Sequence, residues 1–244
     1  MALVLEENER AVLYNFAVEK LSSLGVVGRV ADLAPGTGGG AYIIAKNLPQ
    51  TQVFGLDLSA EAVKSAEKSF SLANLFFKLG DVTVTPWNDG YFDAVVSFHT
   101  IEHMDEANQN KFLSEIGRIL KAGGVLLMAT PDRDVLEIQG FAGAQPDHVR
   151  ELNQEEFLRT VRNNGFVIDA ICGQSVLKGG RFPLRRLLNF LKKLDVFNLR
   201  KKISPKLVNV IDMKTHPVDF GKPVKRLADG EKASTTVLIC RKPS

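Results

Sequence analysis

Three aspartates, Asp32, Asp57 and Asp81, each stand at the end of a predicted strand and surround one glycine-rich turn over residues 36–40. Glycines without Cβ let the backbone turn sharply and let a ligand approach the main chain. The free N–H groups at the start of the following helix can face that ligand. The pattern therefore indicates the floor of a nucleotide-type cofactor site.

The three carboxylates suit three different groups of such a cofactor. Asp32 can help to order the turn and reach the amino end of a bound amino-acid moiety. Asp57 follows Gly38 by 19 residues, where a carboxylate meets the two hydroxyls of a ribose. Asp81 can accept a hydrogen bond from an adenine amino group while Val82 packs on the ring. One strand-end aspartate is commonly a turn former, but that explanation does not account for three around one turn.

The turn by itself leaves the cofactor open. Residues 36–41 also satisfy the loose G-x-G-x-x-G/A dinucleotide fingerprint, so an NAD-binding oxidoreductase is one alternative. A strand-to-helix turn with a purely structural role is another. Asp32, the Gly80-Asp81 pair and an isolated final strand argue against NAD, and no set of hydride-transfer residues is evident.

The elements that would position these residues alternate between strand and helix, and the continuous apolar run over 94–96 predicts a strand buried on both faces. This rhythm predicts a doubly wound α/β sheet with its ligand at the carboxyl ends of the strands. A loop of about twenty residues after Pro131 is too long to be a simple connection and is a functional candidate. Strands are predicted over 29–34, 52–58, 74–79, 91–98, 125–130, 166–172 and 234–241, and helices over 7–24, 39–48, 105–121 and 153–164, with another after the N-cap candidate Ser59.

Length and composition fit one globular domain, because 244 residues with 45% hydrophobic and 24% charged side chains can bury a full core. Cys172 and Cys240 have neither metal-ligand spacing nor a disulfide framework, so we expect both to be buried apolar residues. The start of the chain has no basic leader, and no window approaches the ~20 apolar residues of a membrane span. A cytoplasmic location is the resulting expectation.

Charge is distributed unevenly along the chain. Residues 174–232 hold 15 Lys and Arg against 5 Asp and Glu, a balance of +10, whereas the remainder carries −7. Leucines three and four apart over 184–194, with basic residues among them, predict a basic amphipathic helix, and a second basic cluster follows at 200–202. Three interpretations compete: a helical cap, a lid that recognises an anionic acceptor, and an interfacial helix that contacts anionic lipid through 181–202. Nucleic-acid binding is not expected, because no base-stacking aromatic series accompanies the charge.

The motifs resemble class I S-adenosylmethionine-dependent methyltransferases of the small-molecule type, which include quinone-biosynthesis and sugar methyltransferases. The matching segments are Asp32-Leu33-Ala34-Pro35-Gly36-Thr37-Gly38 and residues 55–59, 80–82, 92–104 and 120–126. Ala34 departs from the pattern, since the family often has glycine there. The resemblance implies S-adenosylmethionine as the cofactor, with contacts from Asp32, Ala34, Gly36, Gly38, Asp57, Leu58, Asp81, Val82, Phe98 and His99.

The same resemblance implies a Rossmann-like sheet of seven strands in the order 3-2-1-4-5-7-6, with strand 7 antiparallel. The chain would then be a single methyltransferase domain over 1–244. Within it, 1–24 is a leading helix, 25–173 and 233–244 form the core, and 174–232 is a basic helical lid or insertion between strands 6 and 7.

Three of the four histidines lie where a general base could act on an acceptor hydroxyl: His99, His103 and His148. Residues 148–157 resemble a stretch that recurs in sugar and lipid-linked methyltransferases, so His148 ranks first and His99 second. A hydrogen-bonded structural imidazole is the alternative for each, and His216 lies beyond the family motifs. Glu102 beside His103 offers two potential metal ligands, but two are too few to predict a metal site, and none is expected.

These observations predict methyl transfer from S-adenosylmethionine to a small-molecule, sugar or lipid-linked acceptor, at oxygen and with a histidine base. A non-catalytic protein that keeps the cofactor site is the remaining alternative. The sequence predicts no particular oligomeric state.

Overall fold

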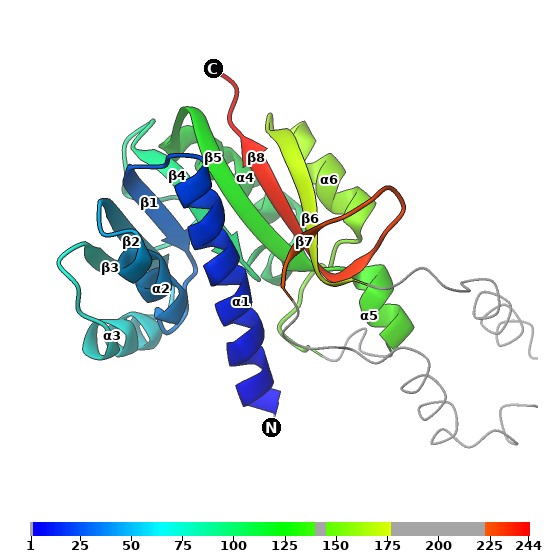
Figure 1. Ribbon diagram of the computed structural model, residues 1–244, viewed down its shortest axis with the longest axis horizontal. Helices are drawn as coiled ribbons and strands as arrows, with labels where there is room; N and C mark the ends of the chain where they lie inside the picture. The colour runs from blue at the N-terminus through cyan, green and yellow to red at the C-terminus, as the bar shows by residue number, and fades with distance from the viewer. Residues whose placement is uncertain (1, 140–144, 177–222) are drawn as a thin grey trace, which may run out of the picture.

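The structure is a computed structural model, which describes residues 2–139, 145–176 and 223–244. One mixed sheet of eight strands forms its centre, in the order β3-β2-β1-β4-β5-β8-β6-β7, with helices on both faces (Figure 1). The strands are β1 Gly28–Leu33, β2 Thr51–Asp57, β3 Leu75–Leu79, β4 Phe92–Phe98, β5 Leu120–Pro131, β6 Val167–Val176, β7 Lys225–Arg226 and β8 Ala233–Arg241. The helices are α1 Ala2–Ser23, α2 Gly39–Asn47, α3 Ala60–Ser69, α4 Glu106–Ile119, α5 Arg133–Gln139 and α6 Gln154–Asn163, with a 3₁₀ turn, η1, over Ile101–His103.

The strand order confirms the predicted Rossmann-like topology. β1 pairs in parallel with β2 and β4, and β8 lies antiparallel between β5 and β6, in the place predicted for strand 7. The difference is the added strand β7, which pairs with Cys172 and Gly173 at the edge of the sheet. Parallel pairing brings the carboxyl ends of β1, β2 and β4 to one edge, where a ligand site is expected.

Two hydrophobic cores pack on the two faces of the sheet. Side chains alternate along β1, so that Val30 packs with the core of α1 and α2 while Ala31 packs with the core of α4 and α6. β4 alternates in the same way, with Val96 in the first core and Val95 in the second. The strands that carry the predicted site are thus held from both sides.

Helix starts follow the capping signals in the sequence. Ser59 Oγ accepts a hydrogen bond from the Ala62 N–H at 3.1 Å, which confirms Ser59 as the N-cap of α3. Asn153 and Glu156 form a capping box at the start of α6. The predicted burial of Cys172 and Cys240 is also confirmed, with burial raising the pKa of the Cys240 thiol to about 12.

Other boundaries differ from the prediction. The segment after Pro131 is not a continuous loop, because α5 occupies its first part. The leading helix begins at Ala2 rather than near residue 7, and β5 begins at Leu120, with an irregularity in its pairing to β4 between Leu120 and Val125. The predicted basic helix over 184–194, the cluster at 200–202 and His216 lie outside the described residues. None of the helices in the described ranges has the length and apolarity that crossing a bilayer requires.

Candidate active site

The glycine turn between β1 and α2 contains one glycine required by packing and one that faces open space. Both have positive φ, +58° at Gly36 and +84° at Gly38. A Cβ on Gly38 would lie 2.6 Å from Ala66 Cβ and 2.7 Å from Phe77 Cζ, so packing excludes any side chain there. Within the described part of the chain, a Cβ on Gly36 would have only Arg10 Nη1 within 4 Å, at 3.9 Å. Gly36 is therefore the position where a ligand can approach the backbone.

Asp57, at the end of β2, orders this turn. Its Oδ2 accepts a hydrogen bond from the Gly36 N–H at 2.9 Å, and its Oδ1 accepts one from the Ser59 N–H at 2.9 Å. Asp32 was expected to help order the turn, but its hydrogen bond in the described residues goes to Tyr14, and Asp57 holds the Gly36 N–H instead. Each carboxylate oxygen keeps a second lone pair, and Asp57 is partly exposed, so it can still accept hydrogen bonds from a ligand.

Asp32, near the end of β1, is fully buried and has one unsatisfied oxygen. Tyr14 Oη of α1 donates a hydrogen bond to Oδ1 at 3.1 Å, while Oδ2 has no hydrogen-bond partner in the described part of the chain. Burial raises the pKa of Asp32 to about 7; the Tyr14 hydrogen bond acts in the opposite direction, and the charge of Asp57 adds to the rise. An orphaned carboxylate oxygen of this kind fits a cationic group on a ligand, such as the ammonium of an amino acid.

Two residues of α1 join this part of the site, and the sequence analysis missed both. Tyr14 bonds Asp32, and Arg10 lies four residues earlier, on the same face of the helix, with Nη1 next to Gly36. The signal was a tyrosine and an arginine four residues apart on the leading helix. Arg10 and Asp32 supply opposite charges near the turn, which suits the carboxylate and the ammonium of an amino-acid moiety.

Ala34 and Phe98 line the same end of the sheet. Ala34 has a φ of +63°, a left-handed conformation that explains why glycine is common there in the family it resembles. Phe98 is buried, with its ring edge-on to Tyr14 at a centroid distance of 5.1 Å. Phe98 therefore supports Tyr14 as well as lying at the predicted contact position.

The predicted adenine side of the site lies at the ends of β2 and β3. Asp81 is exposed, and its Oδ1 accepts hydrogen bonds from the N–H and Oγ1 of Thr83, at 2.7 and 2.8 Å. Val82 is buried, whereas Leu58 is 73% exposed. An exposed leucine beside two strand-end carboxylates offers apolar surface to a ligand ring.

A second group of polar residues surrounds Glu102 in η1. Glu102 is fully buried, and its Oε2 accepts a hydrogen bond from Thr130 Oγ1 of β5 at 3.0 Å. His99, whose φ is +56°, lies just after β4 with Nδ1 3.3 Å from Glu102 Oε1. Burial raises the pKa of Glu102, but the neighbouring His99, a backbone hydrogen bond and the charge of His103 together lower it by more, so the net shift is downward.

Hydrogen bonds hold the segment over 145–152 against η1. The carbonyl oxygen of Glu102 accepts from the N–H groups of Val149 and Arg150, at 2.9 and 3.0 Å. The buried Gln109 amide of α4 donates to the carbonyls of Ile101 at 3.0 Å and Arg150 at 3.1 Å. This segment brings His148 to Glu102 and His103, a meeting of residues more than 40 positions apart in the sequence.

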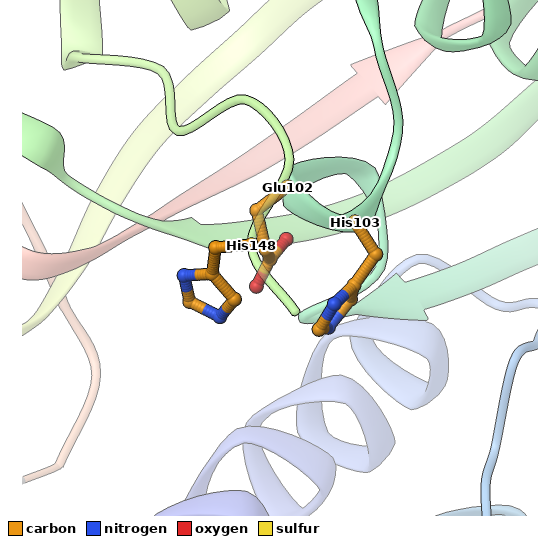
Figure 2. A group of neighbouring side chains, drawn as sticks. All are labelled: Glu102, His103 and His148. Carbon is orange, nitrogen blue, oxygen red and sulfur yellow. The ribbon is translucent and has the colours of Figure 1, made fainter. Parts of the chain in front are cut away.

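His103 and His148 lie on either side of the Glu102 carboxyl group (Figure 2). Their rings are 5.1 Å apart between centroids and nearly perpendicular, at 83°. His148 Nδ1 lies 2.7 Å from Glu151 Oε1, and His103 Nδ1 lies 3.0 Å from the carbonyl oxygen of Asp147. The structure thus brings all three predicted histidines to one carboxylate.

The two groups of residues meet at the end of β1. Ser97 Oγ and Thr100 Oγ1 both donate to the carbonyl oxygen of Leu33, at 3.2 and 3.4 Å. The strand that carries Asp32 is therefore tied to the segment that leads to His99 and Glu102. A ligand on the turn and a second molecule at the histidines would lie next to each other at the carboxyl edge of the sheet.

A family model described as a methyltransferase domain matches residues 31–128, which include the turn, Asp32, Asp57, Asp81, His99 and Glu102. This match favours the methyltransferase prediction over the NAD-binding alternative. It ends before the segment that carries His148.

Three curated relatives have S-adenosylmethionine or methyl transfer in their names. A probable S-adenosylmethionine-dependent methyltransferase of Mycolicibacterium smegmatis is 31% identical over 144 residues, 59% of this chain and 54% of the relative. Phthiotriol/phenolphthiotriol dimycocerosates methyltransferase 1 of Mycobacterium ulcerans is 31% identical over 133 residues, which are 52% of this chain and 46% of the relative. The ubiquinone/menaquinone biosynthesis C-methyltransferase UbiE of Desulfotalea psychrophila is 35% identical over 118 residues, which are 48% of this chain and 47% of the relative. The chain spans about half the length of the curated relatives it matches.

Among solved structures, the fold resembles a chain of the complex between the Haloferax volcanii Trm112 methyltransferase activator and a methyltransferase. The TM-score is 0.65 at 19% identity, and the match covers 98% of this chain and 91% of that one. At this identity the likeness concerns the fold alone. The family match over residues 31–128, the curated relatives and the strand order agree, and together they support a class I S-adenosylmethionine-dependent methyltransferase.

Proposed function

We propose that this protein transfers the methyl group of S-adenosylmethionine to a hydroxyl of a small-molecule, sugar or lipid-linked acceptor. The observation that carries the proposal is the convergence of His99, His103 and His148 on Glu102, beside the strand that bears Asp32. When bound, S-adenosylmethionine supplies a methyl group already activated on a sulfonium. The protein therefore needs to hold the acceptor in line and to remove its proton.

The residues of the turn fit the cofactor in charge and shape. Asp32 Oδ2, buried and without a hydrogen bond in the described residues, would receive the ammonium, and Arg10 would pair with the carboxylate. Asp57 would accept from the ribose hydroxyls while it continues to hold the Gly36 N–H. Asp81, Val82 and Leu58 would surround the adenine.

His148 is our first candidate for the general base. Its side chain is 9% exposed, and Nδ1 lies 2.7 Å from Glu151 Oε1. An imidazole that donates Nδ1–H to a carboxylate is held in one tautomer and keeps the Nε2 lone pair for a proton. Such a base contributes roughly 10² to 10⁴ in rate. His99, 3.3 Å from Glu102 Oε1, is the second candidate.

The acceptor class is supported by names of relatives and by charge. One relative is named a phthiotriol/phenolphthiotriol dimycocerosates methyltransferase, and another a quinone-biosynthesis C-methyltransferase. Residues 174–232 carry a balance of +10. We propose that this segment contacts an anionic acceptor or, through 181–202, an anionic lipid surface, where a lipid-linked acceptor would lie.

Calorimetric titration of the full chain with S-adenosylmethionine, S-adenosylhomocysteine and NAD tests the cofactor. In separate titrations we expect one equivalent of S-adenosylmethionine or of S-adenosylhomocysteine to bind, and no binding of NAD. Tight NAD binding without S-adenosylmethionine binding contradicts the proposal. Transfer of labelled methyl to a panel of quinols, sugars and lipid-linked glycosides then tests the reaction. An O-methyl ether is the expected product, and cofactor binding without transfer to any class would favour a non-catalytic protein. Transfer to carbon would overturn the proposed O-methylation.

A further inference from the structure

We infer that Glu102, His103 and His148 form a binding site for a divalent transition-metal ion of the Zn²⁺ type. One ligand atom from each of the three lies within 4.8 Å of those of the other two. Figure 2 shows the carboxyl group of Glu102 between the two imidazoles, with the rings contributed by different segments of the chain. This site does not depend on methyl transfer, although it lies on the acceptor side of the proposed active site.

The separation suits a site that closes slightly on its ion. Ligand atoms at about 2.0–2.2 Å from one Zn²⁺ lie about 3.3 Å from each other in tetrahedral geometry. The ligand atoms therefore need to approach each other by at most about 1.5 Å. His103 is exposed and at the edge of the group, so its ring can make that movement without disturbing the core.

Both histidines have the outer partner that metal-bound histidines usually have. His148 Nδ1 lies 2.7 Å from Glu151 Oε1, and His103 Nδ1 lies 3.0 Å from the carbonyl oxygen of Asp147. Donation of Nδ1–H to such an oxygen fixes the tautomer and leaves the Nε2 lone pair for the ion. Two neighbouring rings with this arrangement, beside a shared carboxylate, are what a three-ligand site requires.

The buried carboxyl group of Glu102 is an independent reason to expect a cation at this site. Its Oε1 is fully buried and has no hydrogen-bond partner in the described part of the chain. A buried carboxylate oxygen without a hydrogen-bond partner is costly, and a bound cation removes that cost. His99 Nδ1 lies 3.3 Å away, outside hydrogen-bond geometry, and is the competing partner for this oxygen.

The ligand set also indicates the class of metal. Two imidazoles and one carboxylate match catalytic Zn²⁺ sites, which keep a further position open. Mg²⁺ and Ca²⁺ prefer sets of oxygen ligands. An ion here would bind the hydroxyl group of the methyl acceptor at the open position and make that hydroxyl more acidic. His148 would then act as a ligand, and His99 would be the histidine left to receive the proton.

Metal binding by the full chain tests the inference without any acceptor. After treatment with a chelator and dialysis, the protein is titrated with Zn²⁺ by calorimetry and with Co²⁺ by visible absorption. We expect one equivalent bound, at least about tenfold weaker binding in both His103→Ala and His148→Ala, and about 10–100-fold weaker binding in Glu151→Gln. His103 is exposed, so His103→Ala tests a ligand without disturbing the core.

The matched control is Glu115→Gln. Glu115 lies on α4 and has a largely buried carboxylate, which is held by Thr85 and Arg118. It is not one of the proposed metal ligands. The Glu115→Gln variant should bind metal as the wild type does, with folding of every variant checked by circular dichroism.

Absence of a stoichiometric site, or equal affinity in the wild type and both histidine variants, overturns the inference. Methyl transfer by metal-free protein would then leave the proposed function standing with His148 as the base, whereas metal binding without any transfer would contradict only the function.

Discussion

Tyr14 Oη donates a hydrogen bond of 3.1 Å to Asp32 Oδ1 and so joins the leading helix to the end of β1. The contact places α1 over the cofactor side of the site, where Arg10 also lies beside Gly36. Because Asp32 is the buried acid we assign to the cofactor ammonium, removal of the tyrosine hydroxyl should change binding while leaving the ring packed against Phe98.

Tyr14→Phe should weaken S-adenosylmethionine binding at pH 7 by up to about tenfold, because loss of the hydrogen bond leaves less of the Asp32 carboxyl group ionised. The Tyr14 hydrogen bond lowers the pKa of Asp32, so the variant should also need a higher pH to reach full affinity. Calorimetry over a range of pH measures both effects. Tyr42→Phe on α2, where the ring stacks on Phe70, is the control and should bind normally.

Cofactor binding should depend on pH through Asp32, whose pKa is raised to about 7 by burial. Only the ionised carboxylate attracts an ammonium, so affinity should rise with pH, by up to tenfold per unit below pH 7, and level off above it. Asp32→Asn should bind more weakly and lose this dependence. A wild-type profile that is flat from pH 5 to pH 8 would contradict the assignment.

The stability of the ligand-free protein should show the opposite trend. A carboxyl group whose pKa is higher in the folded state than its ordinary value of 3.8 binds more protons when folded between pH 4 and pH 7. Asp32 should therefore lower the free energy of unfolding by up to about 1.4 kcal/mol per pH unit as pH rises through that window. Asp32→Asn removes this loss, so its stability relative to the wild type should increase from pH 4 to pH 7. Urea unfolding at each pH measures the difference.

Ala34→Gly should stabilise the protein by up to about 1 kcal/mol. Ala34 has a φ of +63°, and the left-handed conformation costs a residue with a Cβ about 1–2 kcal/mol, which exceeds the entropic cost of glycine. Ala31→Gly, at a buried position of β1, is the matched control and should destabilise. If both variants lose stability equally, the left-handed conformation of Ala34 does not cost the protein stability.

Gly36→Ala and Gly38→Ala should separate ligand binding from folding. At Gly38 the added Cβ would meet Ala66 and Phe77 at less than 3 Å, so we expect a loss of at least about 2 kcal/mol of unfolding free energy. At Gly36 the added Cβ meets no atom of the described residues closer than 3.9 Å, so the cost should be the backbone strain of about 1–2 kcal/mol, with a larger relative loss of cofactor affinity. Thermal unfolding and calorimetry on the same samples distinguish the two.

The sequence was informative where the signal was local. The glycine turn and the capping residues Ser59 and Asn153 act within a few positions, and their roles were predictable. The meeting of His148 with Glu102 was not, because it depends on hydrogen bonds from Val149 and Arg150 to the Glu102 carbonyl across more than 40 residues. The role of Asp57 in ordering the turn was missed for the same reason, since its partner is the Gly36 N–H on another element.

The central claim is that the turn holds the cofactor while the histidines act on the acceptor. Its most direct test is the dissociation constant for S-adenosylmethionine together with the rate of labelled-methyl transfer, in the wild type and in His148→Ala. We predict a nearly unchanged dissociation constant and a rate of transfer lower by roughly 10² to 10⁴. Unchanged turnover in His148→Ala would contradict the account.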